Sequence, residues 1–222
     1  MAGTGRKYRR LCGALSVSLL FVIAGCHDGG ERRDVNQSEP APTAGQLCGD
    51  DLVLAKTSAA LEVITGGKRE DIVDDGATLA GAARDIKVRR NSVLSDIGDV
   101  CHIAVPSAPR VRRLNVFWQL LPKNSDEPAP KYTTLRMGEG AGAAWDEAYV
   151  TFLCSASTAP HVSPAYVSVY VESRGFSTEP RDDVKNLSNA HLTVAHAFSL
   201  AIAKEVGCAE EARIPAEPVL IP

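Results

Sequence analysis

Residues 165–172 read AYVSVYVE, and small or branched apolar residues alternate with polar or aromatic ones along the whole stretch. Strict alternation over this length predicts a β-strand with one face in the core and the other toward solvent. The core face is expected to hold Ala165, Val167, Val169 and Val171, and the outward face Tyr166, Ser168, Tyr170 and Glu172. The rest of the fold prediction is built outward from this strand.

Three further stretches carry the same alternation, at 100–105, 112–121 and 149–155. Pro106 and Pro122 end the first two, since proline cannot donate to a strand ladder. A segment with two prolines joins 149–155 to 165–172, and these two strands are expected to pair as an antiparallel hairpin. The three core faces are expected to hold Cys101, Ile103 and Val105; Leu114, Val116, Trp118 and Leu120; and Val150, Phe152 and Cys154.

Helical periodicity predicts helices at 50–64, 77–88 and 182–206. The last is the strongest and ends at Gly207, with a buried stripe of Leu187, His191, Val194, Phe198, Ala201 and Ile202. The other two are expected to bury Leu52, Ala55, Ala59 and Val63, and Leu79, Ala82, Ala83 and Ile86. The predicted fold class is α+β: an antiparallel sheet of about four strands with helices packed on one face, including a long C-terminal helix.

Residues 123–147 are expected to form a long polar connection. A mobile loop is one interpretation, and a flap or partner-binding loop that presents Trp145 is the other. The glycines between 138 and 142 do not make a phosphate loop, because the lysine of that motif is missing.

The N-terminus has the layout of a secretory leader, with four cations in residues 6–10 and an apolar run at 11–23. That run is shorter than the roughly 20 residues of a spanning helix. Ile23-Ala24-Gly25-Cys26 resembles the bacterial lipobox, which implies cleavage before Cys26 and diacylation of its sulfur. An ordinary signal peptide with an incidental cysteine is the alternative.

This leader predicts a lipid-anchored protein on the extracytoplasmic face of the cell membrane, held there by two acyl chains. Residues 1–25 are the expected signal peptide, and 26–46 the lipidated cysteine with a flexible tether. Residues 47–215 are the expected single globular domain, and 216–222 a C-terminal tail. Two anchoring chains suffice for stable attachment.

Four cysteines remain in the predicted mature domain, Cys48, Cys101, Cys154 and Cys208, at spacings too long for a CxxC metal or redox motif. An even number in an oxidising compartment favours disulfides. The predicted topology favours the pairs Cys48–Cys101 and Cys154–Cys208. In the second pair, the C-terminal helix would return over the sheet and bring Cys208 to the core-facing Cys154.

Charge and motifs exclude several function classes. Without the four leader cations the chain has 20 basic and 27 acidic residues, a formal net charge of −7, which argues against nucleic-acid binding. His191 and His196 are five residues apart, which does not suit two metal ligands on one helix face. His191 is instead expected to be a hydrogen-bonded core residue. No metal, cofactor or catalytic residue is predicted.

Tyr166, Tyr170 and Glu172, together with Trp145, form the predicted candidate binding surface. The leading hypothesis is a non-catalytic envelope domain that binds a protein, a glycan or a small ligand. The competing hypothesis is an extracytoplasmic hydrolase with a His/Ser or His/Asp site around His161 or His102. A purely structural envelope component is the third.

Three stretches together resemble uncharacterised secreted proteins and lipoproteins of Streptomyces-type actinobacteria: LCG at 47–49 with the following Ala-rich helix, the strand pair around Cys154, and AHLTVAHAFSLAIAKEVGC at 190–208. The resemblance covers about residues 47–215. It implies the fold and the disulfide cysteines, and it carries no catalytic residue.

Overall fold

The computed structural model describes residues 46–90, 95–110, 113–122, 129–155, 166–174 and 183–222, which all belong to one compact unit. Within these ranges the chain forms an antiparallel sheet of seven strands in the order β1-β2-β3-β7-β6-β5-β4. The strands are β1 (Val73–Asp75), β2 (Asp96–Ala104), β3 (Arg113–Leu121), β4 (Thr133–Leu135), β5 (Gly140–Ala143), β6 (Glu147–Leu153) and β7 (Tyr166–Arg174).

The helices are α1 (Asp51–Thr65), α2 (Leu79–Arg89), α3 (Val184–Val206), the short α4 (Ala209–Ala212) and a 3₁₀ turn at Arg69–Asp71. Local sequence sets their ends. The Asp50 carboxylate accepts a hydrogen bond from the backbone N–H of Val53 and caps α1. Gly66 and Gly207 follow α1 and α3 in the left-handed conformation, with φ of 69° and 89°, which glycine adopts without steric cost.

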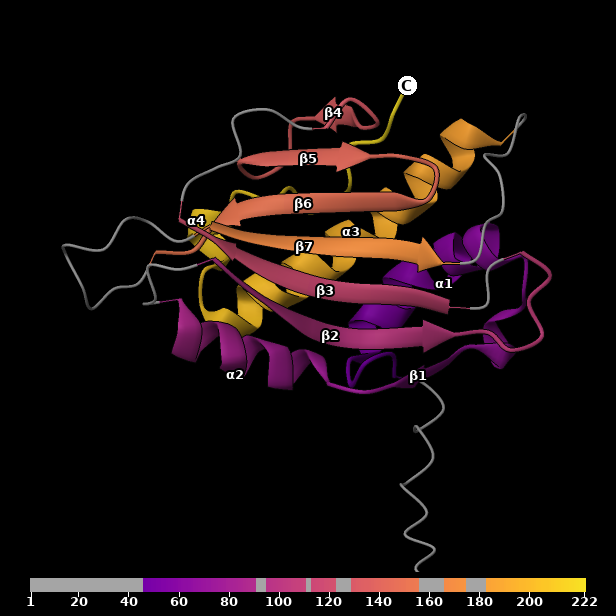
Figure 1. Ribbon diagram of the computed structural model, residues 1–222, viewed down its shortest axis with the longest axis horizontal. Helices are drawn as coiled ribbons and strands as arrows, with labels where there is room; N and C mark the ends of the chain where they lie inside the picture. Colours follow the sequence, from indigo (N-terminus) through magenta and orange to yellow (C-terminus); the bar gives the residue numbers. More distant parts are fainter. Residues whose placement is uncertain (1–45, 91–94, 111–112, 123–128, 156–165, 175–182) are drawn as a thin grey trace, which may run out of the picture. The chain divides into compact units, whose positions relative to one another are not determined.

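The described helices α1, α2 and α3 all lie on one face of the sheet (Figure 1). Helix α3 packs directly against β5, β6 and β7, α2 packs against β2 and α3, and α1 packs on α3. The opposite face carries no helix among the described residues. We call this helix-free side the open face.

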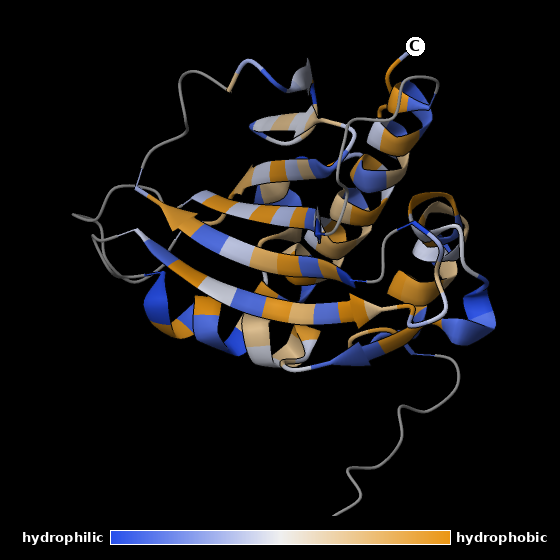
Figure 2. Ribbon diagram, turned by 45° about the vertical axis from the view of Figure 1, so that its right-hand side comes forward, coloured by the Kyte–Doolittle hydropathy of each residue, from blue (hydrophilic) through white to orange (hydrophobic). Residues whose placement is uncertain are grey.

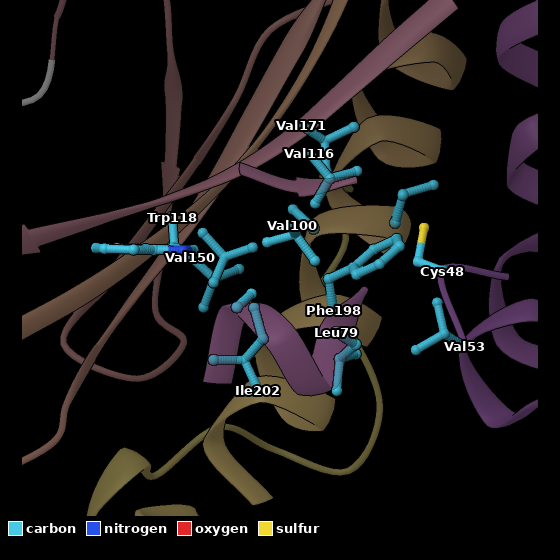
Figure 3. Close-up of a cluster of buried hydrophobic side chains, with 14 of the residues drawn as sticks. Cys48, Val53, Leu79, Val100, Val116, Trp118, Val150, Val171, Phe198 and Ile202 are labelled. Atoms are coloured by element: carbon cyan, nitrogen blue, oxygen red, sulfur yellow. The ribbon is translucent and has the colours of Figure 1, made fainter. Parts of the chain in front are cut away.

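The core lies between the sheet and the helices. Hydropathy alternates along the long strands (Figure 2), and every second residue of β3, from Leu114 to Leu120, is buried in this core. Figure 3 shows Val100, Val116 and Val171 of the sheet beside Phe198 and Ile202 of α3 and Leu79 of α2, and all six are fully or almost fully buried.

Both predicted disulfides are confirmed. Cys48 is bonded to Cys101 with a Cα–Cα distance of 5.9 Å, which ties the segment before α1 to β2. Cys154 is bonded to Cys208 with a Cα–Cα distance of 5.2 Å, which ties the end of β6 to the turn after α3.

The α+β class, the antiparallel pairing, the helix-covered face and the long C-terminal helix are confirmed, but the expectation of about four strands is wrong. The sheet has seven, because β1, β4 and β5 add to the four predicted ones. β4 and β5 lie within 123–147, so the part of that segment from residue 129 onward is not a long loop. These strands have only three or four residues each, too few for periodicity to reveal them.

The buried stripe of α1 was also predicted wrongly. Leu52 is 63% exposed, and α1 instead buries Val53, Leu54, Thr57, Ala60, Leu61 and Ile64. The reason is that apolar residues surround most of this helix, so spacing alone does not select a face.

Residues 216–222, which we expected to form a tail, are held by Asn189 of α3 and by Met137, whose sulfur accepts from the N–H of Val219 at 3.2 Å. The side-chain N–H of Asn189 donates to the carbonyl of Ile221 at 3.2 Å, and the side-chain oxygen of Asn189 accepts from the N–H of Ile221 at 2.8 Å. Near the start of this segment, the His196 Nε2 lies 2.8 Å from the carbonyl oxygen of Pro215.

Gly98 in β2 is required by the buried ring of Trp118. A Cβ atom at position 98 would lie 2.7 Å from Cε2 and 2.9 Å from Nε1 of that ring, which is only 1% exposed. We expect Gly98→Ala to lower the free energy of unfolding by about 2 kcal/mol, the usual cost of overpacking a core. Urea unfolding followed by circular dichroism measures it.

Gly140→Ala in β5 is the matched control, because nothing lies within 4 Å of a Cβ placed there. This variant should unfold at the same urea concentration as the natural protein or slightly above it. Equal losses from both alanines would contradict the packing of Trp118 over Gly98.

Candidate binding surface

Aromatic side chains cross the open face in a line. Phe117 on β3, Tyr170 on β7 and Tyr149 on β6 stand directly opposite one another in the strand register. Phe117 and Tyr170 are stacked with ring centroids 4.9 Å apart, and Tyr170 and Tyr149 follow at 5.6 Å. Tyr132, just before β4, meets Tyr149 edge-on at 5.0 Å. We call these four residues the aromatic row.

Gly142 on β5 makes room for the end of this row. It stands opposite Tyr149, and a Cβ atom there would lie 2.6 Å from Cε1 of Tyr149 and 3.0 Å from the Cβ of Tyr132. The ring of Tyr149 therefore lies over the glycine, with the Cβ of Tyr132 beside it, and fills the gap left by the missing side chain.

Burial changes the ionisation of the tyrosines in the row. Partial desolvation raises the pKa of Tyr149 and Tyr170 above the usual value near 10. The pKa of Tyr132 is raised further. Burial is the larger cause, and the second is that the Tyr132 hydroxyl donates a hydrogen bond to the Glu147 carboxylate at 2.6 Å. These hydroxyls remain neutral donors at any physiological pH.

A line of polar side chains runs beside the aromatic row. The strand register places Asp75, His102, Asn115, Glu172 and Glu147 opposite one another from β1 to β6. Several of these side chains have polar partners. His102 Nδ1 lies 3.2 Å from the Asp75 carboxylate, and the Glu147 carboxylate pairs with Lys131.

Two arginines extend this polar line. Arg113 and Arg174 stand opposite each other on β3 and β7. Two like charges in this position repel each other unless acidic side chains lie nearby. Arg113 lies 3.6 Å from Asp75, and Arg174 lies 3.3 Å from Glu172. Both arginine side chains are more than half exposed, so each ion pair contributes at most about 1 kcal/mol to stability.

A hollow of about 440 Å³ opens where the polar line meets the aromatic row. A β-bulge in β2 helps to form it. The register with β3 shifts between Asp99 and Cys101, which lets Val100 and Cys101 both be buried. Because of this extra residue, Ile97 and Asp99 face the hollow together with His102. The other lining residues are Arg113, Asn115 and Phe117 of β3 and Glu172 and Arg174 of β7.

Of the residues that the sequence singled out, Tyr170 and Glu172 belong to this region, one in the aromatic row and one in the hollow. Tyr166 is on the same face of β7 but four residues from Tyr170 and six from Glu172, opposite Leu121 and Leu153. Trp145 lies in the tight turn between β5 and β6, half-buried. Ser168 faces the same side as predicted, yet it is buried and hydrogen-bonded to Thr151 at 2.6 Å.

His191 is a hydrogen-bonded core residue, as predicted. It is 0% exposed, its Nδ1 lies 2.8 Å from the Leu187 carbonyl, and its Nε2 lies 2.6 Å from the Ser173 hydroxyl. A carbonyl only accepts, so Nδ1 carries the hydrogen and Nε2 accepts from Ser173. Burial lowers the pKa of His191 to about 4, so the ring is neutral.

The other sites considered from sequence give no catalytic cluster. His161 lies outside the described residues. His102 is paired with Asp75 on the open face, with no serine hydroxyl among its hydrogen-bond partners in the described ranges. In those same ranges no group of three His, Cys, Asp or Glu side chains is arranged to hold a metal ion.

A second, apolar hollow of about 180 Å³ lies between α1 and α3.

Comparisons with known proteins add no relative. No family model matches the chain, and neither a curated protein nor a solved structure is significantly similar to it. None of the described helices is both long enough and apolar enough to span a bilayer.

Proposed function

We propose that this protein is a lipid-anchored, extracytoplasmic binding domain that acts without catalysis and contacts its ligand through the open face. The leader pattern that ends at Cys26 and the two disulfides support the location, since disulfides persist in oxidising compartments. The anchor would hold the domain at the membrane, and the tether of residues 27–46 would give it reach.

The arrangement of the open face is the observation that carries the binding role. A domain of this size needs one covered sheet face for its core, and α1, α2 and α3 provide it. The other face still gathers four aromatic rings beside a polar hollow, with a bulge and a glycine that shape both. Aromatic side chains around a shallow hollow with convergent polar groups are typical of ligand sites.

The binding role is tested with full-length protein in detergent and envelope material from cells that lack it. We expect Phe117→Ala/Tyr170→Ala to weaken sedimentation with the envelope about tenfold, as the loss of central aromatic contacts usually does. Gly142→Ala should weaken it too, because the added methyl clashes with the ring of Tyr149 and displaces it.

Leu52→Ala/Val88→Ala is the matched control. Both residues are exposed apolar side chains of the helices, at 63% and 73%, so the change removes apolar surface away from the open face. This variant should bind the envelope like the natural protein. If the control and the Phe117/Tyr170 variant bind equally well, the open face is not the contact surface.

The anchor is tested by the intact mass of protein purified from membranes. The expected species begins at Cys26 and carries a diacylglyceryl group. A chain that keeps residues 1–25 and has no lipid would contradict the proposed location.

A hydrolase remains the second candidate because Ser173 and His191 make the contact of a serine nucleophile with its base. Ser173 is only 8% exposed and neither residue lines a hollow described above. We therefore expect a fluorophosphonate probe to leave Ser173 unmodified, as judged by peptide mass spectrometry. Labelling of Ser173 that disappears in His191→Gln would favour the hydrolase.

A further inference from the structure

The ligand class can be inferred from the charges of the hollow. Arg113 and Arg174 contribute two positive charges to its lining, and Asp99 and Glu172 two negative ones. Arg113 and Arg174 also have acids within 4 Å, in Asp75 and Glu172. A negatively charged ligand would have to break one of these two ion pairs or leave a charge unbalanced, whereas an uncharged polar ligand would do neither.

The lining also suits a ligand with many hydroxyl groups. Asn115 offers a donor and an acceptor, Arg174 and Arg113 offer N–H groups, and Asp99 and Glu172 offer acceptor oxygens. A hydroxyl group both donates and accepts, so it can use any of these partners. Five of the eight lining residues are titratable, which is unlike the core of a protein–protein interface, where charged residues are depleted.

Phe117 supplies the apolar side of the hollow. One face of its ring is stacked on Tyr170, so the ring presents its other face and its edges to the hollow. The C–H groups of a sugar ring are partly positive and pack against the negative face of an aromatic ring, for the same electrostatic reason that governs aromatic pairs.

The aromatic row continues this apolar surface past the hollow. From β2 to β6 the open face crosses three strand spacings, about 14 Å in all. Polar and aromatic residues run side by side over this distance, which suits an extended ligand with polar edges and apolar ring faces.

We propose that the hollow and the aromatic row bind an uncharged oligosaccharide segment. This inference rests on the proposed binding role of the open face and names its ligand class. A sugar ring would pack against Phe117 in the hollow, and its hydroxyl groups would bond to Asn115, Glu172 and Arg174. Further sugar units would extend over Tyr170 and Tyr149.

The test is isothermal titration of the full-length protein in detergent with chitohexaose, cellohexaose and mannohexaose, each to about 5 mM, which covers weak single-site binding. We expect at least one of them to bind. We expect Asn115→Ala and Phe117→Ala each to weaken that binding about tenfold, and Val88→Ala, on the distant surface of α2, to leave it unchanged. Because Asn115→Ala and Phe117→Ala are made as two separate proteins, the test still holds if one of them fails to fold.

Salt separates this proposal from an anion site. Binding of an uncharged sugar should change less than about twofold between 50 and 500 mM sodium chloride, because no charge is neutralised. Inorganic phosphate and citrate are titrated in parallel. Binding of these anions alone, with a strong loss of affinity in salt, would overturn the proposal and assign the hollow to an anionic ligand.

Absence of binding by all three sugars, or binding that Asn115→Ala and Phe117→Ala leave intact, would also overturn it. The proposed function has its own outcome in the envelope assay. If the Phe117/Tyr170 variant loses envelope binding while the sugars do not bind, the open face is a contact surface for another class of ligand.

Discussion

Replacing Cys154 and Cys208 with alanine together should lower the free energy of unfolding by about 4 kcal/mol, because the bridge closes a loop of 54 residues in the unfolded chain. The bridge holds the start of α4, just after α3, to the end of β6, so it joins the helix layer to the sheet. Urea unfolding without reductant measures the loss. Both cysteines are replaced at once so that no free thiol remains.

The Cys48→Ala/Cys101→Ala variant provides the comparison. Its loop of 53 residues is almost the same length, so the chain-entropy argument predicts an almost equal loss. A loss below about 1 kcal/mol in both variants would mean that the unfolded chain is not constrained by these bridges.

Acidification should destabilise the protein through His191. In the folded state its pKa is about 4, whereas an unfolded chain binds the proton near pH 6.5. Between these two values the unfolded state holds the proton and the folded state does not. The contribution of His191 is therefore fully present above pH 6.5 and is lost as the pH falls to about 4, by about 3 kcal/mol in total.

His191→Gln isolates this effect. Other groups that titrate in acid, including His196, whose pKa burial also lowers, are present in both proteins and cancel in the comparison. The variant should be less stable at neutral pH, because the contact with Ser173 is disturbed, and its stability should fall less between pH 7 and pH 4. Parallel pH curves for the two proteins would contradict a neutral, buried His191.

Alternation was a good guide to the buried faces of β3, β6 and β7, whereas for β2 it indicated only the part from residue 100 onward and missed residues 96–99. The inward positions of β3, such as Val116 and Trp118, and of β7, such as Val169, were predicted correctly, because one buried face imposes a period of two. The disulfide pairs followed from that topology. The short strands β1, β4 and β5 were missed, since three or four residues with few branched side chains hold no detectable period.

The candidate binding surface was only partly predictable. Tyr170 and Glu172 were found because they alternate with valines on β7. The sequence did not indicate that Phe117 lies beside them. The register that sets Phe117 opposite Tyr170 depends on how β3 and β7 pair, and neither strand alone determines it. The bulge at Val100 was equally hidden, although the adjacent apolar pair Val100-Cys101 in an otherwise alternating strand is a signal that could have indicated it.

Hydroxyl-radical footprinting in the intact envelope tests the central claim most directly, because it reports the solvent access of individual side chains. We compare the protein in its native envelope with the same protein purified in detergent. If the open face binds a ligand, Phe117 and Tyr170 should be oxidised severalfold more slowly in the envelope, while Leu52 and Val88 on the helices react equally in both. Equal oxidation of Phe117 and Tyr170 in the two preparations would contradict the account.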